Sequence, residues 1–329
     1  MKRTGFLYDK ICDIENLKLA FWKASKGKRD CGEVIAFSNR LEDNLLKMRG
    51  QLLSHQPDLG HYHFFTIREP KERLICASSF HERILHHAII NICEPVLERF
   101  AIFDSYACRK EKGNRRAIAR CQEFARLHPW YLKLDIRQYF GSINHAMAAS
   151  ILSRLFKDSR LLGLFDQILA SYNSGVRGVG LPIGNLVSQY LANLYLGTMD
   201  HWLKEERRVG GYLRYMDDFV LFATTRNLLS IELREIGTFL GDKLKLRLKD
   251  KIQLNRTNLG VPFLGFRIYP TKILLLPQSK KRFIRKHKVY MDHYHSGHWN
   301  EKTLARHLEP LIEFTKIADS LNLRRKVIF

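Results

Sequence analysis

The chain has 329 residues, with 55 lysines and arginines against 33 aspartates and glutamates, so its formal net charge is +22. Because so much like charge opposes folding, we expect a polyanionic partner, with nucleic acid favoured over a membrane surface. The chain has no run of about 18 apolar residues, no apolar leader, and no C-x-x-C pair among its six cysteines. We therefore expect a cytoplasmic protein without a membrane span, a secretory signal, a zinc site or a disulfide framework.

The first part of the chain combines predicted helices with one hairpin. Residues 1–60 are predicted to be helical. Residues 68–76 place a polar Pro-Lys-Glu turn between two apolar runs, which predicts a β-hairpin. Lys71 and Arg73 in this hairpin, and Arg83 shortly after it, are candidates for phosphate contacts, because Arg suits bidentate binding. The alternative is a solvated hairpin that carries surface charge.

A buried strand is predicted next, over residues 131–136, with Asp135 at its carboxyl end. A carboxylate in such an apolar run is costly unless it is paired with a cation or bound to a metal. Lys133 and Arg137 are near enough in sequence to pair with it, so the strand alone leaves both explanations open. Phe140 follows five positions after the aspartate.

The segments around the central motifs are predicted to be mainly helical. Helices are expected over 144–156, 161–172, 188–204 and 228–240, and a strand is expected over 244–248. Glycines at 175, 178 and 180 indicate a loop before Pro182. This pattern predicts a mixed fold in which the helices surround a small number of apolar strands.

Residues 210–223 place two adjacent carboxylates, Asp217 and Asp218, between two strand-like segments, which predicts a β-hairpin with the pair at its tip. Ionised side chains this close repel, and two Mg²⁺ ions would offset the repulsion because Mg²⁺ prefers carboxylate oxygen. With Asp135 and the backbone carbonyl of Ile136, the pair could bracket two metals about 3.5–4 Å apart, which suits in-line nucleotidyl transfer. The alternative is a solvated turn, since Asp favours turns.

Residues 280–288 hold six cations in nine positions and no acidic residue. The cations are Lys280, Lys281, Arg282, Arg285, Lys286 and Lys288. On a helix anchored by Phe283 and Ile284 they would face a duplex backbone, so binding should weaken steeply as salt rises. A merely solvated face is less favoured, because the run has no acidic partners.

Four motifs in this order resemble the palm of a reverse transcriptase. They are the strand that ends at Asp135, Gly180–Gln189, Tyr215–Asp218 and Phe263–Phe266, and the resemblance covers about residues 65–270. It implies an α+β, right-hand polymerase fold with fingers, palm and thumb and a catalytic antiparallel sheet in the palm. The implied domains are an N-terminal helical extension at 1–60, fingers at 61–128, palm at 129–270 and a basic helical thumb at 271–329.

The resemblance also implies roles for single residues. The three aspartates would be catalytic, and the nucleotide-binding residues would be Lys71, Arg73, Arg83, Phe140, Ile183, Gly184 and Gln189. Phe140 would be the steric gate that selects deoxynucleotides, although the neighbouring Tyr139 leaves the register open. Leu264 and Gly265 would belong to the primer grip, and the basic helix would track the template–primer duplex.

Two details resemble the reverse transcriptases of diversity-generating retroelements. Ile183 stands where other families usually carry glutamine, and Ser188-Gln189 stands where they carry Ser-Pro. An apolar side chain cannot replace the hydrogen bonds of an amide, so discrimination would depend more on base pairing. The resemblance implies misincorporation opposite adenines of a structured template RNA, a small basic ring-forming accessory protein, and a bacterial or phage origin.

Three alternatives stay open. A group II intron-like or retron reverse transcriptase would share the fold and the chemistry but copy faithfully. A non-catalytic RNA-binding protein of the same fold would be expected to lack a metal carboxylate, whereas all three are present. A palm-fold nucleotide cyclase would not need the charge of +22 or the basic C-terminal helix.

Overall fold

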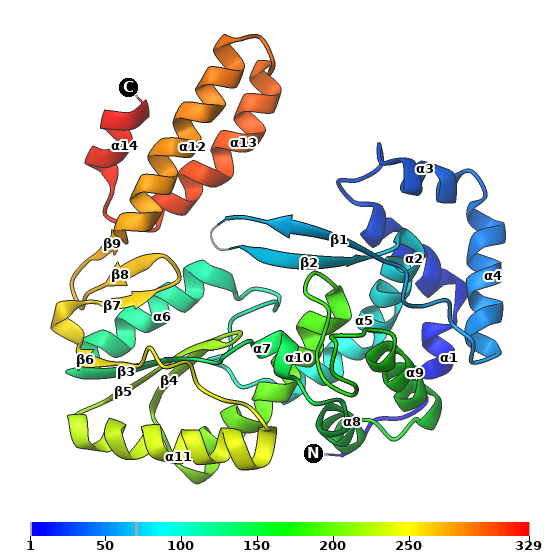
Figure 1. Ribbon diagram of the computed structural model, residues 1–329, viewed down its shortest axis with the longest axis horizontal. Helices are drawn as coiled ribbons and strands as arrows, with labels where there is room; N and C mark the ends of the chain where they lie inside the picture. The colour runs from blue at the N-terminus through cyan, green and yellow to red at the C-terminus, as the bar shows by residue number, and fades with distance from the viewer. Residues whose placement is uncertain (1, 70–71, 329) are drawn as a thin grey trace. The chain divides into compact units, whose positions relative to one another are not determined.

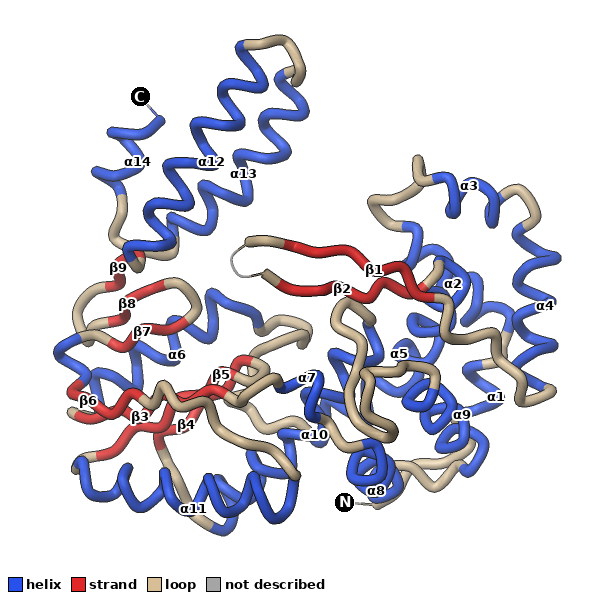
Figure 2. Tube along the Cα trace, viewed as in Figure 1, coloured by secondary structure: helices blue, strands red, loops and turns tan. Residues whose placement is uncertain are grey.

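The computed structural model describes residues 2–69 and 72–328, which fold into two compact units (Figure 1). The first unit contains residues 1–103, 136–207 and 236–249, and the second contains residues 104–135, 208–235 and 250–329. Helices and antiparallel sheets occur together, as the predicted α+β class requires (Figure 2). The predicted fingers, palm and thumb boundaries do not coincide with these units and stay a prediction.

Helices make up most of the first unit. They are α1 (Tyr8–Ile11), α2 (Ile14–Ser25), α3 (Gly32–Ser38), α4 (Leu41–Leu53), α5 (Phe80–Phe100), α7 (Tyr139–Ser142), α8 (His145–Leu155), α9 (Ser159–Ala170) and α10 (Leu186–His201), which continues into a π-helical turn, η1 (Trp202–Glu206). The Ser79 side chain caps α5 by accepting a hydrogen bond from the Glu82 N–H. Both α2 and α10 pack against α5, so this helix forms the centre of the unit.

The same unit contains a two-stranded antiparallel hairpin, β1 (Tyr62–Ile67) and β2 (Arg73–Ser78), which confirms the hairpin predicted around residue 70. Side chains alternate between its two faces, and those of Phe64, Phe65 and Leu74 are exposed. Burial begins only in the second half of β2. Most of the hairpin therefore has no protein layer on either face.

An antiparallel sheet of four strands, in the order β4-β5-β3-β6, is the platform of the second unit. The strands β3 (Trp130–Asp135), β4 (Gly211–Tyr215) and β5 (Asp218–Ala223) are largely buried, whereas β6 (Gln253–Arg256) is a more exposed edge strand. These bounds confirm the predicted strand that ends at the first aspartate and the predicted hairpin over 210–223. Apolar side chains on the inner strands explain why this sheet can be buried.

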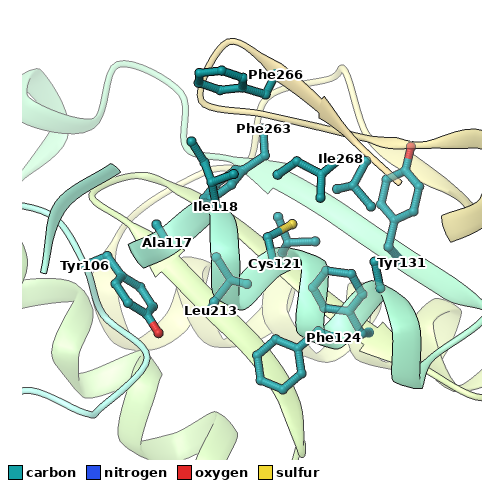
Figure 3. Packing of buried hydrophobic residues seen from close by; sticks show 14 of the residues in the cluster. Tyr106, Ala117, Ile118, Cys121, Phe124, Tyr131, Leu213, Phe263, Phe266 and Ile268 are labelled. Atoms are coloured by element: carbon teal, nitrogen blue, oxygen red, sulfur yellow. The ribbon is translucent and has the colours of Figure 1, made fainter. Parts of the chain in front are cut away.

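Helix α6 (Gly113–Leu127) contacts both this sheet and a smaller one made of β7 (Val261–Phe263), β8 (Phe266–Ile268) and β9 (Ile273–Leu275). Figure 3 shows Ile118 and Cys121 of the helix in one cluster with Phe263 and Ile268 of the smaller sheet and Leu213 of the larger sheet. A short 3₁₀ turn, η2 (Thr257–Leu259), connects β6 to β7. One hydrophobic core thus supports both sheets of the second unit.

Three helices follow the smaller sheet: α12 (Pro277–His295), α13 (Glu301–Lys316) and α14 (Leu321–Ile328). The ring of Phe314 in α13 packs on Phe266, with ring centroids 4.7 Å apart. The predicted basic helix is confirmed, and Phe283 is buried as expected, but Ile284 is 41% exposed and does not anchor it. Among the described helices, none is long and apolar enough to cross a lipid bilayer.

The other predicted elements agree with the structure except for one strand. The helices expected over 144–156, 161–172, 188–204 and 228–240 correspond to α8, α9, α10 and α11 (Arg226–Leu244). The strand expected over 244–248 is wrong, because α11 continues to Leu244 and only Leu248 pairs, in a single bridge to Ile136. Leu244 ends the helix, and Leu246 is buried just beyond it, where its N–H donates to the Leu240 carbonyl oxygen at 2.9 Å. Alternating buried leucines at a helix end cannot be distinguished from a short strand by pattern alone.

Candidate active site

Strand register places the carboxylates of the second unit. In the antiparallel pair of β3 and β5, Asp135 lies directly opposite Asp218. Residues opposite each other in such a pair project from the same face of the sheet. Asp217 occupies the turn between β4 and β5, next to Asp218. The three predicted catalytic aspartates are therefore at one end of one sheet, and each is half-buried.

A two-residue turn, Met216–Asp217, closes the hairpin, because Tyr215 pairs with Asp218. Met216 has a positive φ of 58°, a conformation that costs a non-glycine residue roughly 1–3 kcal/mol. The Arg214 guanidinium offsets this cost by donating a hydrogen bond from Nη1 to the Met216 carbonyl oxygen at 3.0 Å. The turn that carries Asp217 is thus held by a side chain of the same hairpin.

Arg214 is a functional candidate that the sequence analysis missed. Its side chain is only 1% exposed, and an arginine is rarely buried without partners. Its backbone N–H donates to the Asp104 carbonyl oxygen at 2.9 Å, and its carbonyl oxygen accepts from the Tyr106 N–H at 2.9 Å. Asp104 also forms an ion pair with Arg120 of α6 at 2.9 Å. The one feature of the sequence that could have identified Arg214 is that it is a cation inside an otherwise apolar strand.

The electrostatic setting of Asp218 fits a bound cation. Burial raises the pKa of its carboxyl to about 6, with Lys133 opposing the rise and Asp135 and Asp217 adding to it. Lys133 Nζ lies 2.9 Å from Asp218 Oδ1, so this lysine, considered above as a partner for Asp135, pairs with Asp218. The same oxygen is buried and accepts no well-directed hydrogen bond. A buried carboxylate oxygen in this state can bind a further positive charge.

The donor set suits Mg²⁺, which prefers carboxylate oxygens. Within residues 2–69 and 72–328, however, no three acidic, histidine or cysteine side chains are grouped closely enough to hold a metal as they stand. Lys133 provides the positive charge beside Asp218 in this arrangement. Ile136, predicted to offer its carbonyl, is fully buried directly after β3. The two Mg²⁺ ions therefore remain a prediction.

In the first unit, Ile183 and Gly184 form the turn before α10. The Ile183 carbonyl oxygen accepts a hydrogen bond from the Cys76 N–H of β2 at 2.8 Å. Gly184 has a φ of +120°, and a Cβ at this position would lie 2.9 Å from the Ile75 side chain, so both the backbone and the close approach require glycine. The turn is therefore fixed against the β1–β2 hairpin. Gln189, within α10, is half-buried.

The two adjacent aromatic residues of α7 have different surroundings. Tyr139 is buried, and its hydroxyl donates to the Ala192 carbonyl oxygen at 2.5 Å. Phe140 is half-buried. Tyr139 is therefore a core residue, which leaves Phe140 as the candidate for the steric gate. That role stays a prediction.

The predicted phosphate-binding cations belong to the region of the β1–β2 hairpin. Arg73 is exposed at the start of β2, where it pairs with Ile67. Arg83 lies in the first turns of α5, where its Nη2 is 3.4 Å from the Ser78 carbonyl oxygen. Lys71 lies outside the described residues. Contact of these residues with the triphosphate stays a prediction.

The predicted primer-grip residues form the turn between β7 and β8. Phe263 pairs with Phe266, so Leu264 and Gly265 are the two turn residues, with φ values of 48° and 91°. A Cβ on Gly265 would lie 2.9 Å from Ser279 Oγ, so the turn packs closely on the start of α12. Of the predicted duplex-binding cations in α12, Lys280, Lys281, Arg285 and Lys288 are exposed, and Arg282 and Lys286 are half-buried.

These features define a class of protein. One end of a small antiparallel sheet in the second unit carries three aspartates, the first unit carries the β1–β2 hairpin and a glycine turn, and a basic helix follows the sheets. This is the plan of a right-hand nucleic-acid polymerase. The chain belongs to the reverse transcriptase (RNA-dependent DNA polymerase) family, whose model matches residues 67–268. Membership places it among the RNA-directed DNA polymerases, which are nucleotidyltransferases.

Similar proteins agree with this family. Protein YkfC of Escherichia coli (strain K12) is 25% identical over 303 residues, which cover 74% of this chain and 78% of that protein. The putative COX1/OXI3 intron 2 protein of Saccharomyces cerevisiae is 25% identical over 131 residues, or 38% of this chain and 15% of that protein. The structure of apo telomerase from Candida tropicalis, truncated from its C-terminal domain, superposes with a TM-score of 0.52 at 12% sequence identity. The match covers 66% of this chain and 55% of the telomerase chain. This last likeness concerns the fold alone.

Proposed function

We propose that this chain is the reverse transcriptase of a diversity-generating retroelement, which makes adenine-mutagenic cDNA from a template RNA. The observation that carries the proposal is Ile183. Its backbone is hydrogen-bonded to β2, so the position of its side chain is defined by a fixed turn. A branched apolar side chain has no hydrogen-bonding group, so accuracy at the new base pair would depend on pairing itself.

Three aspartates of the second unit would supply the chemistry. Asp135, Asp217 and Asp218, with the backbone carbonyl of Ile136, the next residue in the chain after Asp135, would hold two Mg²⁺ ions. When bound, these ions supply an activated primer hydroxyl and a stabilised pyrophosphate leaving group. The protein prepares the site by burying Asp218 beside two other carboxylates, so that its ionised form requires a neighbouring positive charge.

The first unit would select the nucleotide. Arg73, Arg83 and Lys71 would contact phosphate, and Phe140 would exclude a 2′-hydroxyl beneath the sugar. Gly184 would allow close approach of the backbone, and Gln189 would lie nearby. In the second unit, the turn at Leu264 and Gly265 would hold the primer end, while the cations of α12 would bind the duplex through its phosphates.

The partners would be the template RNA, its hybrid with the cDNA, and deoxynucleoside triphosphates. The charge of +22 supports a polyanionic partner. A small basic ring-forming accessory protein would assist synthesis. A bacterial or phage origin agrees with the similarity to an Escherichia coli protein. A cytoplasmic location belongs to the same proposal.

Copying a defined RNA in vitro tests this proposal. Purified protein would receive the template, Mg²⁺ and all four deoxynucleotides, and the cDNA would be sequenced, with accessory protein and cognate RNA in a parallel reaction. We expect errors concentrated at template adenines. Accurate cDNA would identify a faithful intron-like or retron-type enzyme instead, and absence of cDNA in both reactions would favour a non-catalytic RNA-binding role.

A further inference from the structure

The turn before α10 is bonded at two points to the edge of β2 that faces away from β1. The Cys76 N–H donates to the Ile183 carbonyl oxygen at 2.8 Å, and the Ser78 N–H donates to Asn185 Oδ1 at 3.1 Å. Because alternate residues of a strand direct their N–H groups to the same edge, these two donors lie side by side. The turn therefore takes the place of a third strand, and Asn185 completes the pairing with its side chain.

Asn185 makes this contact instead of capping its own helix. It is 3% exposed and occupies the N-cap position of α10, where an asparagine usually accepts from an N–H of the first turn. Asn144 and Asn300 do so before α8 and α13, at 3.0 and 2.9 Å. The Asn185 side chain makes no such bond to α10. The oxygen that would stabilise the helix thus holds β2.

The two bonds lie on either side of Gly184, where the turn approaches β2 most closely. A Cβ at this glycine would lie 2.9 Å from Ile75 Cγ2 and 3.3 Å from the Cys76 carbonyl oxygen. One hydrogen bond would leave the turn free to pivot about it, whereas two bonds fix its orientation. The half-buried Ile183 side chain is oriented by the same turn. Its direction therefore depends on the Asn185 bond.

We propose that Asn185 is a positioning residue for base-pair discrimination, because its bond to β2 fixes the orientation in which Ile183 meets the new base pair. The inference rests on the proposed role of Ile183 in copying RNA. An apolar side chain without hydrogen-bonding groups discriminates through its shape and place alone. A turn that can pivot should therefore accept mismatched pairs more readily. Asn185 acts through Ile183 and contacts no reacting atom.

The first measurement follows the hydrogen bond itself, in protein without nucleic acid. Hydrogen–deuterium exchange and mass spectrometry would report on the peptide that contains Ser78. Asn185→Leu and Asn185→Ala both remove the acceptor, and the alanine variant avoids crowding in the buried site. Exchange at this peptide should be about fivefold faster in both, the factor that corresponds to one hydrogen bond. Asn185→Asp keeps an acceptor oxygen and should exchange as the wild type does. Unchanged exchange in the leucine and alanine variants would overturn the proposal.

The second measurement is the ratio of kcat/KM for deoxythymidine triphosphate to that for a mismatched nucleotide, opposite a template adenine. The ratio should fall about fivefold in Asn185→Leu and Asn185→Ala. It should stay unchanged in Asn185→Asp, because the added charge affects both nucleotides alike. Ile183→Ala should also lower the ratio, and Asn185→Leu should lower it no further in that background. A wild-type ratio in Asn185→Leu, or effects of the two substitutions that add in full, would overturn the proposal.

Asn16→Leu is the matched control for stability. Asn16 is another buried asparagine of the first unit, and its Nδ2 donates to the Ile11 and Ala88 carbonyl oxygens, both at 3.1 Å. Its loss should lower the melting temperature and leave the ratio unchanged. An equal fall of the ratio in Asn16→Leu would assign the effect to stability and overturn the proposal. Accurate copying by the wild type would reject the mutagenic function, whereas the ratio of variant to wild type still tests Asn185.

Discussion

The β4–β5 and β1–β2 hairpins, which both carry predicted site residues, are built in opposite ways. The β4–β5 hairpin lies within a four-stranded sheet, and nearly all of its residues away from the tip are buried. Within the described part of the chain, no further strand pairs with the β1–β2 hairpin, which exposes Phe64, Phe65 and Leu74. The protein supports the β4–β5 hairpin on its faces and edges. The β1–β2 hairpin instead leaves most of its apolar surface exposed to solvent.

This difference matches two kinds of task. Catalytic carboxylates must keep their geometry to within about 0.5 Å, which requires the buried platform and the Arg214 support found at the β4–β5 tip. An open hairpin can instead accept different ligands, because exposed rings such as those of Phe64 and Phe65 stack on any base. The predictions below test the contributions of the rigid β4–β5 hairpin and of the open β1–β2 hairpin separately.

The largest effect is expected at the tip of the buried hairpin. Asp217→Asn should slow cDNA synthesis roughly a thousandfold or more, because the amide binds metal poorly and metal stabilisation is worth several kcal/mol. The melting temperature should change little, since Asp217 is half-exposed. Asp250→Asn, an exposed carboxylate of the same unit, serves as the control for primer-extension rates. Retained synthesis in Asp217→Asn would contradict the assignment of the catalytic carboxylates.

Arg214→Met tests whether the rigidity of this hairpin matters apart from its carboxylates. The Met216 carbonyl would lose its donor, and a displacement of about 1 Å at a catalytic group can cost about a hundredfold in rate. We expect synthesis to fall tenfold to a hundredfold, roughly on that basis, and the free energy of unfolding to fall by about 1–3 kcal/mol.

The Mg²⁺ dependence of Arg214→Met distinguishes positioning from packing. The concentration that gives half-maximal synthesis should rise, and Arg214→Lys should recover only part of the loss because lysine lacks the planar fork of donors. A destabilised variant whose folded fraction keeps the normal rate and Mg²⁺ dependence would show that Arg214 serves the core alone.

A smaller effect is expected beside the open hairpin. Ile183→Gln restores an amide at the fixed turn and should lower errors opposite template adenine about fivefold, the factor that corresponds to one hydrogen bond of about 1 kcal/mol. Sequencing of cDNA would measure this. Val176→Gln, at a residue that is 62% exposed, introduces the same amide away from the turn and should leave the error spectrum unchanged. An unchanged spectrum in Ile183→Gln would make Ile183 a packing residue.

The smallest effect concerns α5, which lies at the base of the open hairpin. His86 is 1% exposed, burial lowers its pKa to about 3, and its Nε2 lies 3.5 Å from Glu82 Oε1. The unfolded chain binds the proton at about pH 6.5. The contribution of neutral His86 to stability is therefore complete above pH 6.5 and is lost as the pH falls from there towards 3.

Urea unfolding between pH 7.5 and 5 would measure this slope. His86→Leu should show a smaller loss of stability on acidification than the wild type, whereas the exposed control His295→Gln should not differ from it. Equal slopes in His86→Leu and the wild type would assign the pH dependence to other groups, such as His87, whose pKa burial lowers to about 4.

Local residue patterns predicted correctly those helices and strands whose pattern is contained within a short segment of the chain. Apolar residues on both sides of a carboxylate pair predicted the β4–β5 hairpin, and the cations of 280–288 predicted the helix that carries them. The strand over 244–248 failed because Leu244 and Leu246 are equally compatible with the end of α11. Ile284 failed as an anchor because the turn of the helix, not its hydrophobicity, decides which side it faces.

The sequence by itself determined the order of the motifs, the family they resemble and the three aspartates, because these depend on residue type and spacing. Only the tertiary structure decided that Lys133 pairs with Asp218, that Arg214 is buried and supports the turn that carries Asp217, and that Phe65 and Arg83 line one pocket. Register and burial are properties of contacts between segments that are distant in the chain. Such contacts have no local signature, so they appear only when the chain is folded.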